Sequence, residues 1–458
     1  MKLIVIGGGV AGYAAALRAA RLGGQVTLIE KDALGGTCLN RGCIPTKCLL
    51  RTAEAVREIR RAGTFGIKAS FEGIDLGAVM RRKDDVVKRL ARGLGALVKA
   101  GGVKLVGGTA TLRDERSVEI VETGEIICGE RIVIATGSVP GRLPTPGSIG
   151  GAVMDSDAAL ALDRLPQSVI VIGGGVVGVE FAQFFHGLGV ETTIIEGLPS
   201  LLAGLDSDLS SLFQRCLVRD GMRVVTGAMV KEVGERAGRP VVRYERDKEG
   251  EVAVTAEKVL IAVGRRPAHE GLGIERLFLP TRDGAIVVDE RMETPVRGVY
   301  AAGDVTGPPM LAHAGLAQGA CAAANALGGD EAMTGRAVPL CVYTNPEIAS
   351  VGLSEEAAKE RHGHVRTARF PLRANGKALI LNETEGFVKV VAEGEGGRIV
   401  GVHILGPHAT ELAAAASMVV TLKLTAREAA SVVHPHPTLS EAFWEAAAAL
   451  CGEAVHVL

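Results

Sequence analysis

The chain has 458 residues, of which 47% are hydrophobic, and its 51 Lys and Arg nearly balance its 52 Asp and Glu. At roughly 150 residues per domain, this length predicts about three domains. The near-neutral charge argues against nucleic acid or an anionic membrane surface as a partner, and it favours small molecules or other proteins.

The chain begins with a predicted strand, glycine turn and helix. The apolar run LIVI leads into GGGVAG, which carries a G-x-G-x-x-G pattern at Gly7, Gly9 and Gly12, and the helical sequence YAAALRAARLGG follows. A second strand, QVTLIE, ends in Glu30. The glycines interrupt the N-terminal apolar run, unlike in a secretory signal, and no uncharged apolar run reaches the roughly 20 residues that cross a bilayer. We therefore expect a cytoplasmic protein with no membrane partner.

The same succession of strand, glycine turn, helix and strand returns in the middle of the chain. VIVIGGGVVG contains Gly173, Gly175 and Gly178, and the strand VETTIIE ends in Glu196 at the same spacing from its first glycine. In this pattern the glycines permit a tight turn, close approach of a pyrophosphate and close packing of the helix, while the acid binds ribose hydroxyls. Two matched copies therefore predict two dinucleotide sites.

Strand-rich sequence follows each copy, and the character of the chain changes near Val338. ERIVIATGSVP and EKVLIAVGRRP each predict a buried strand that ends in a glycine turn, and GVYAAGDVTGPPMLAHAGLAQG predicts a strand, a turn and a helix. Beyond Val338, VPLCVYTNPEIASVGL, GFVKVVAE and RIVGVHILG predict strands, whereas TELAAAASMVVTLKL and LSEAFWEAAAAL predict helices. The expected fold class is α/β, with two Rossmann-like dinucleotide-binding domains and a C-terminal α+β domain.

Between the two copies, the segment GGTCLNRGCIPTK places Cys38 and Cys43 close together. The spacing to Cys48 matches neither a zinc site nor an iron–sulfur cluster, so we expect no metal, and a structural disulfide would be unusual in a cytoplasmic protein. A catalytic dithiol fits, because it could exchange electrons with a flavin at the first site while a nicotinamide at the second supplies or collects hydride. We therefore predict a relay of nicotinamide, flavin and disulfide. The other cysteines are expected to be small buried hydrophobic residues, namely Cys128, Cys216, Cys321, Cys341 and Cys451.

Together these motifs resemble the FAD-dependent pyridine nucleotide–disulfide oxidoreductases of class I. The matching segments are GGTCLNRGCIPTK, both glycine patterns, ATGS, AVGRRP, AAGD, YTNPEIASVGL and HPHPTLSEAF, and they extend from Lys2 to about Phe443. The resemblance implies a homodimer, and it divides the chain into an FAD-binding domain with the redox disulfide, an NAD-binding domain, a central segment that completes the FAD site and an interface domain. The corresponding ranges are 1–145, 146–265, 266–335 and 336–458.

The resemblance also implies which residues bind the cofactors. The first glycine pattern and Glu30 would bind the adenosine half of FAD, and the second pattern and Glu196 would bind NAD. Lys47 would lie near the reactive flavin nitrogen, paired with Glu180, and Asp304 would hold the ribityl chain. Further residues implied along the two cofactors are Thr37, Thr136, Gly137, Gly264, Gly303 and Ala312.

The reacting groups follow from the same resemblance. Cys43 would lie against the flavin as a thiolate when reduced, and Cys38 would meet the substrate. His436 would be the base that takes and returns a proton, and it would come from the neighbouring subunit. Glu441 would orient His436, but TLSE is also a capping box in which Thr438 is the N-cap and Glu441 bonds to the backbone of Thr438.

The acid of the second copy favours NAD over NADP. Glu196 can accept hydrogen bonds from ribose hydroxyls and would repel a 2′-phosphate, and the next basic residue, Arg215, is too far along the chain to bind that phosphate. Ala268, His269 and the loop EGLPSLLAGLD differ from the residues common in relatives, and they leave the affinity for NAD open.

Within the family, the motifs are most similar to the branch that oxidises protein-bound dihydrolipoamide and reduces NAD to NADH. The expected partner is the lipoyl-bearing subunit of a 2-oxoacid dehydrogenase or glycine cleavage complex. One alternative is an NAD(P)H-dependent reductase of another low-molecular-weight disulfide, similar to glutathione reductase. Another is a binding subunit that docks within a multienzyme complex, which the intact dithiol, base and cofactor sites disfavour. His434 is predicted to pack or to face solvent.

Overall fold

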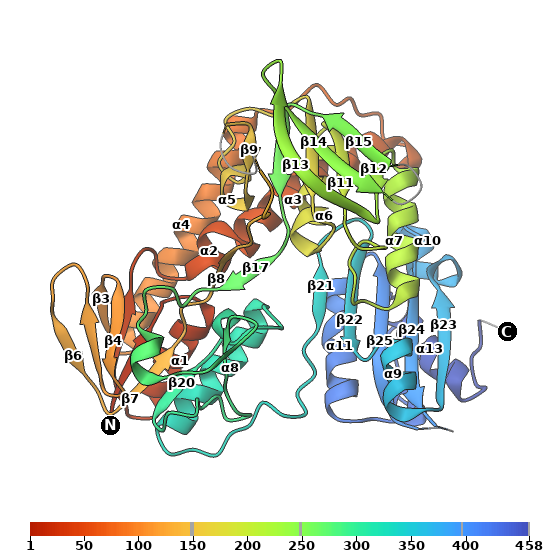
Figure 1. Ribbon diagram of the computed structural model, residues 1–458. Helices are drawn as coiled ribbons and strands as arrows, with labels where there is room; N and C mark the ends of the chain where they lie inside the picture. The colour runs from red at the N-terminus through yellow and green to blue at the C-terminus, as the bar shows by residue number, and fades with distance from the viewer. Residues whose placement is uncertain (147–150, 247–249, 395–396, 457–458) are drawn as a thin grey trace.

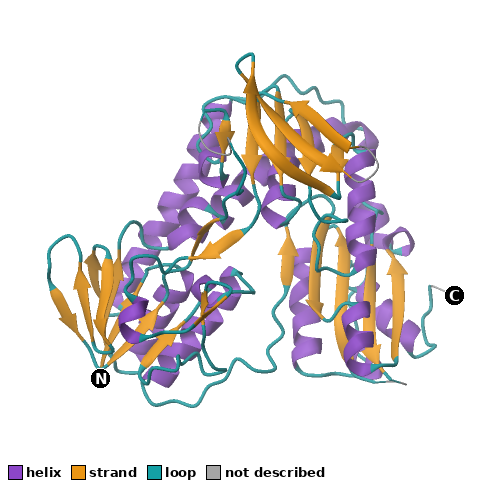
Figure 2. Cartoon of the chain, in the orientation of Figure 1, coloured by secondary structure: helices purple, strands orange, loops and turns teal. Residues whose placement is uncertain are grey.

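Three five-stranded sheets form the framework of the computed structural model, which describes residues 1–146, 151–246, 250–394 and 397–456 (Figures 1 and 2). Two of these sheets are parallel and contain the two glycine patterns, and the third is antiparallel and C-terminal. The predicted fold class, with two Rossmann-like units and a C-terminal α+β unit, is confirmed.

The first sheet has the strand order β20-β7-β1-β2-β3. Its strands are β1 (Lys2–Ile6), β2 (Gln25–Glu30), β3 (Lys104–Gly107), β7 (Arg131–Ile134) and β20 (Val299–Ala301). Helices α1 (Val10–Arg21) and α8 (Ala312–Ala326) pack closely, because Gly319 faces the backbone of Ala11 and a Cβ there would lie 2.1 Å from its carbonyl oxygen. The segment with β20 and α8 thus returns to the N-terminal sheet from far along the sequence (Figure 1).

The second sheet has the strand order β12-β11-β10-β16-β9. Its strands are β9 (Val153–Met154), β10 (Ser168–Ile172), β11 (Glu191–Ile195), β12 (Arg223–Val225) and β16 (Lys258–Ile261). Its helices are α5 (Ser156–Ala159), α6 (Val176–Gly187) and α7 (Ser207–Arg219). A small antiparallel sheet shares an apolar cluster with it and consists of β13 (Ala228–Arg236), β14 (Arg239–Arg246) and β15 (Gly250–Thr255).

The C-terminal sheet is antiparallel, with the strand order β21-β22-β25-β24-β23. Its strands are β21 (Leu340–Val342), β22 (Glu347–Gly352), β23 (Val365–Pro371), β24 (Phe387–Glu393) and β25 (Ile399–Gly406). The helices of this part are α9 (Glu355–His362), α10 (Gly376–Leu381), α11 (Ala409–Thr421), α12 (Ala426–Ala430) and α13 (Glu441–Leu450). Helix α11 packs on β22 and β25, and α13 packs on β23 and β24.

Three helices follow the first glycine unit, namely α2 (Gly36–Arg41), α3 (Cys43–Arg61) and α4 (Leu76–Ala100). Smaller sheets are formed by β4 (Ala110–Asp114), β5 (Ser117–Ile120) and β6 (Ile126–Cys128), by β8 (Ser138–Pro140) with β17 (Arg265–Pro267), and by β18 (Thr281–Arg282) with β19 (Ala285–Ile286). Short 3-10 turns span Ala62–Phe65, Ile274–Leu277, Asp304–Thr306 and Leu372–Ala374. No helix in the described ranges is both long enough and apolar enough to cross a bilayer.

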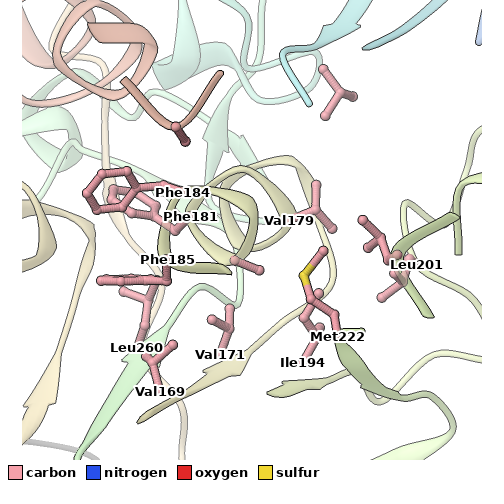
Figure 3. Close-up of a cluster of buried hydrophobic side chains, with 14 of the residues drawn as sticks. Val169, Val171, Val179, Phe181, Phe184, Phe185, Ile194, Leu201, Met222 and Leu260 are labelled. Carbon is pink, nitrogen blue, oxygen red and sulfur yellow. The ribbon is translucent and has the colours of Figure 1, made fainter. Parts of the chain in front are cut away.

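One apolar cluster holds α3 in place. Three phenylalanines of α6 and residues of β10 form its centre (Figure 3). Leu49 of α3 and Ile348 of β22, both fully buried, belong to the same cluster. The helix that begins with Cys43 is therefore packed against both the second nucleotide unit and the C-terminal sheet.

Some local expectations differ from the structure. Helix α1 begins at Val10, directly after the second glycine of the pattern, because the turn itself supplies the helix N-terminus. The expectation that Cys128 is buried is wrong: Cys128 is exposed because alternation along β6 turns Ile127 inward instead. Cys216 and Cys321 are buried as expected, and Cys341 and Cys451 are partly buried. The domain limits at 145, 265 and 335 stay predictions.

Candidate active site

The first glycine turn lies between β1 and α1. Gly7 has φ +100°, and a Cβ there would lie 2.3 Å from the carbonyl oxygen of Ala135, while a Cβ on Gly12 would lie 1.7 Å from the oxygen of Gly7. Both glycines are therefore required by the fold. Gly9 is different, because the nearest atom to its Cβ would be Gly36 Cα at 3.8 Å. Gly9 keeps free space at the N-terminus of α1, where a phosphate could approach.

The second glycine turn, between β10 and α6, has the same construction. Gly173 has φ +110°, and its Cβ would lie 2.3 Å from the oxygen of Ala262, while a Cβ on Gly178 would lie 1.9 Å from the oxygen of Gly173. A Cβ on Gly175 would meet nothing within 4 Å. At both predicted sites the second glycine of the pattern therefore leaves a space that a side chain would fill. This space fits a pyrophosphate group.

The two acids bond to the glycine turns in matching ways. Glu30 Oε2 accepts a hydrogen bond from the Gly8 amide at 2.6 Å, and Glu196 Oε2 accepts one from the Gly174 amide at 2.5 Å. The other oxygens accept from the amides of Asp32 at 2.8 Å and Leu198 at 2.7 Å. A carboxylate offers about four acceptor positions, so each acid retains capacity for ribose hydroxyls.

Alanine substitutions should separate the two glycine roles at the second turn. Gly175→Ala is expected to fold normally and to bind NADH roughly 10- to 200-fold more weakly, the effect of one misplaced carbon in a binding site. Gly178→Ala is expected to lose about 1–3 kcal/mol of folding free energy, since its Cβ overlaps the Gly173 carbonyl. Calorimetric titration with NADH and thermal unfolding would measure the two effects. Equal NADH affinity in Gly175→Ala and the native protein would contradict a pyrophosphate at this turn.

Other residues predicted to line the first cofactor gather at the carboxyl ends of the same strands, where open α/β sheets bind ligands. Thr136 and Gly137 follow β7, Gly303 and Asp304 follow β20, and Ala312 begins α8. The Thr136 hydroxyl is buried and has no hydrogen-bond partner among the residues that the structure describes, which fits a polar cofactor beside the first turn. These residues therefore fit FAD.

The side chain of Asp304 belongs to a polar network that the sequence did not predict. The Ser138 hydroxyl donates to Asp304 Oδ2 at 2.5 Å, and Arg265 Nε donates to the same hydroxyl oxygen at 2.7 Å. Gly264, a predicted cofactor-binding residue, lies next to Arg265 with φ +99°. The network joins the turn after β7 to the turn after β16, so the two cofactor regions share a boundary.

The cysteine pair lies at the junction of α2 and α3. Cys38 is in α2 with the predicted flavin-side residue Thr37, and Cys43 is the first residue of α3. Both cysteines are free thiols joined by a hydrogen bond. That bond from Cys38, together with the Lys47 ammonium, lowers the pKa of Cys43, and the same bond raises the pKa of Cys38. The helix N-terminus also favours a thiolate at Cys43.

Two features of the sequence could have indicated this helix. Pro45 lies in its first turn, where amide groups have no partner within the helix and proline is tolerated. Gly42, the N-cap, precedes Cys43. GCIPTK therefore indicates a helix that begins at Cys43, which was not among the predictions from the sequence.

Lys47 and Glu180 form an ion pair one turn into α3. Lys47 Nζ lies 2.8 and 3.0 Å from the carboxylate oxygens of Glu180, a residue that is 2% exposed. The Tyr343 amide donates to Glu180 Oε1 at 3.0 Å, and Lys47 Nζ lies 4.6 Å from the centre of the Tyr343 ring. The structure thus places an ammonium group next to the cysteine pair and holds it with a buried carboxylate.

Glu441 makes both contacts that the sequence left as alternatives. Its Oε1 lies 2.8 Å from His436 Nδ1, and its Oε2 accepts a hydrogen bond from the Thr438 amide at 2.7 Å. Burial would raise the pKa of Glu441, but the Thr438 amide and His436 outweigh it and the pKa is lowered. The expectation that Thr438 is the N-cap is wrong, because α13 begins at Glu441 with Ser440 as its N-cap, and the Thr438 hydroxyl donates to Pro435.

His436 and the cysteines are not brought together within one chain. The His436 side chain is 78% exposed, and α13, which follows it, lies on the right of the molecule, whereas α2, which contains Cys38, lies on the left (Figure 1). His434 is partly buried, contacts the Val432 carbonyl at 2.9 Å, and its ring centre lies 6.5 Å from that of Phe443. His434 therefore packs and faces solvent, as predicted.

Comparisons with known proteins agree with this arrangement. The pyridine nucleotide-disulphide oxidoreductase family model matches residues 1–319, and the dimerisation domain of the same family matches residues 338–447. The dihydrolipoyl dehydrogenase of Thermus scotoductus is 42% identical, covering 100% of this chain and 98% of that protein, and one from Bacillus subtilis is 39% identical, covering 99% and 98%.

Two solved structures show the same fold. LpdA from Mycobacterium tuberculosis has a TM-score of 0.90 at 29% identity, covering 98% of this chain and 99% of that one. The HOCl-induced flavoprotein disulfide reductase RclA from Escherichia coli has a TM-score of 0.86 at 28% identity, covering 98% and 99%. The chain therefore belongs to the pyridine nucleotide–disulphide oxidoreductase family and contains its dimerisation domain.

Proposed function

We infer that this chain is a dihydrolipoyl dehydrogenase, an FAD- and NAD-dependent enzyme that oxidises protein-bound dihydrolipoamide to lipoamide and reduces NAD to NADH. The observation that carries this proposal is the pair of interacting cysteines, Cys38 and Cys43, beside the Lys47 ammonium. Dihydrolipoyl dehydrogenases that match the chain over nearly its full length support it as well. The two glycine turns supply one site for each dinucleotide.

The thiol chemistry follows from the two cysteines. One thiolate of dihydrolipoamide attacks the Cys38 sulfur of a Cys38–Cys43 disulfide, which forms a mixed disulfide and releases Cys43 as a thiolate. The second substrate thiol then attacks the mixed disulfide, so that lipoamide leaves and the enzyme holds a dithiol. Cys43 suits the leaving role because its pKa is lowered, and a thiol of lower pKa leaves faster. Bound FAD supplies the two-electron transfer between this dithiol and NAD.

His436 is proposed as the base for the exchange. It would accept the proton of the attacking dihydrolipoamide thiol through Nε2, while Glu441 holds Nδ1 and stabilises the imidazolium. Glu441 would also order the turn before α13 through the Thr438 amide. Both contacts exist together, so Glu441 would serve in positioning and in local folding.

The base is proposed to come from the second subunit of a homodimer. The exposure of His436 and the position of α13 on the other side of the molecule from α2 support this arrangement, and so does the dimerisation domain. Apolar side chains on the same part of the chain are exposed in the single subunit, including Met418, Leu422 and Val433 at 60%, 66% and 93%. A second copy would remove this apolar surface from water.

The partner that carries the substrate is proposed to be the lipoyl-bearing subunit of a 2-oxoacid dehydrogenase or glycine cleavage complex. The likeness to the disulfide reductase RclA favours one second candidate, a reductase of a low-molecular-weight disulfide that uses the same cysteines. The comparisons do not favour the other alternative, that the chain is a docking subunit without catalytic activity. A cytoplasmic location stays a prediction.

The first experiment is dihydrolipoamide-dependent reduction of NAD by the purified holoenzyme, with NADP measured beside it. We expect rapid turnover with NAD and little with NADP, because Glu196 faces the second glycine turn where a 2′-phosphate would be repelled. Equal rates with NADP would contradict the role of Glu196. A flavin that is reduced by NADH in an enzyme inactive with dihydrolipoamide would instead favour the second candidate.

A further inference from the structure

The loop 197–205, part of the Gly- and Leu-rich segment that follows Glu196, lies directly against the second glycine turn. Glu196 precedes it, and the Leu202 amide donates to the Gly174 carbonyl at 2.9 Å. Leu201 is fully buried and packs so closely that a Cβ on Gly174 would lie 2.4 Å from its side chain. Both polar groups of the Gly174 backbone are therefore set by Glu196 and this loop.

The first glycine turn makes the same contact with a different residue. The Gly8 carbonyl accepts a hydrogen bond from the Gly35 amide at 2.8 Å, and Gly35 has φ +99°. Leu202 takes the equivalent place with φ +51°. Glycine adopts a left-handed conformation freely, whereas leucine does so only where its surroundings impose it. The second turn therefore needs a constraint that the first does not.

A buried ionic cluster provides that constraint at the far end of the loop. Asp206, the N-cap of α7, is fully buried, and its carboxylate oxygens lie 2.9 and 3.0 Å from Lys389 Nζ. Asp206 also accepts a hydrogen bond from the Glu355 amide at 3.1 Å. Lys389, which is 1% exposed, contacts Asp208 at 2.7 Å and the Glu355 carboxylate at 2.8 Å.

The cluster joins two parts of the molecule. Asp206 and Asp208 belong to the start of α7 in the second nucleotide unit, while Lys389 is on β24 and Glu355 begins α9 of the C-terminal part. Loop 197–205 is thus held at one end by the glycine turn and at the other by the C-terminal sheet. Removing one partner of a buried charge pair leaves the other uncompensated, so the cluster resists movement of Asp206.

We propose that Asp206 and Lys389 are positioning residues for the second dinucleotide site. Their ion pair fixes the end of loop 197–205, keeps Leu202 in its left-handed conformation and so holds the Gly174 backbone and Glu196 where the dinucleotide binds. The proposal rests on the proposed function for naming NAD as that dinucleotide.

The test is calorimetric titration of the FAD-loaded double variant Asp206→Asn/Lys389→Met with NADH. The double change removes both buried charges with little change in volume, while Asp208 keeps Arg369 at 2.6 Å and Glu355 keeps Lys359 at 2.6 Å. We expect the Kd for NADH to rise roughly 3- to 30-fold, the size of effect seen for residues that act on a site through others. The KM for dihydrolipoamide is expected to stay unchanged.

Glu385→Gln is the matched control. It removes the ion pair of Glu385 with Arg219, 2.7 Å apart, which joins the other end of α7 to the same C-terminal part. We expect its Kd for NADH to equal that of the native protein. An equal rise of the Kd for NADH in the control would overturn the proposal. So would an unchanged Kd in a double variant whose Tm is lowered, since the cluster would then contribute to stability alone.

A milder variant decides the matter if the double variant does not fold. Glu355→Gln changes a carboxylate whose side chain is 25% exposed, and we expect a smaller rise of the Kd in the same direction. An unchanged Kd in Glu355→Gln would then overturn the proposal. NADH binding is measured without a dithiol, so the result stands even if dihydrolipoamide is not the substrate.

Discussion

Replacing Cys43 by serine is expected to abolish dihydrolipoamide-dependent reduction of NAD. The variant cannot form the disulfide, and it lacks the thiol whose pKa is lowered by Cys38 and Lys47. The half-reduced variant should also lack the long-wavelength absorbance of a thiolate lying against a flavin. Visible spectra recorded during anaerobic reduction, together with the turnover rate, would measure both losses.

Cys38→Ser is the matched control for this prediction. It also removes the disulfide and should be inactive, but it keeps Cys43 at the start of α3 beside Lys47, and the serine hydroxyl can still donate to it. We therefore expect the long-wavelength absorbance to persist in Cys38→Ser. Loss of the band there and its survival in Cys43→Ser would show that the two cysteine roles are reversed.

His436→Gln is expected to slow thiol exchange by roughly 10²- to 10⁴-fold, the usual contribution of a positioned general base. Binding of FAD and NADH should be unaffected, since the His436 side chain is 78% exposed and contacts Glu441 rather than either glycine turn. The difference in rate between His436→Gln and the native enzyme should become smaller as pH rises, because the substrate thiol then ionises without a base. Steady-state rates from neutral to alkaline pH would measure this dependence.

The neighbouring histidine offers a control in the same segment. His434 is partly buried, and its Nδ1 contacts the Val432 carbonyl rather than a carboxylate. His434→Gln is therefore expected to keep normal turnover at all pH values. If both variants retained normal rates, His436 would have no part in the mechanism, and if both lost activity equally, the effect would be one of local structure.

Much of the molecule could be predicted from the sequence because the constraints are local. Gly7 and Gly173 have positive φ, and a Cβ on either would overlap the backbone just after a neighbouring strand, so the turns can be recognised from a few consecutive residues. The acids Glu30 and Glu196 follow at a spacing set by one helix and one strand. The apolar segments beyond Val338 likewise indicated the strands of the C-terminal sheet.

Other features depended on the resemblance or were not predicted at all. The pairing of Lys47 with Glu180 joins residues 133 positions apart, so only the resemblance could suggest it. TLSE suggested a cap at Thr438, but the helix begins at Glu441, whose two carboxylate oxygens contact His436 and the Thr438 amide. The TLSE pattern accounts for the contact of Glu441 Oε2 with the Thr438 amide, but not for the contact of Oε1 with His436.

The sequence by itself determined the two dinucleotide turns, the position of the dithiol and the α/β architecture, since each depends on residues close together in the chain. Only the tertiary structure decided how these units are held: the ion pair of Asp206 and Lys389 spans 183 positions, and no local pattern links its members. Such contacts form because folding buries both charges in one place, where each must find a partner. The conformation of Leu202 is set in the same way, by its surroundings and against its own preference.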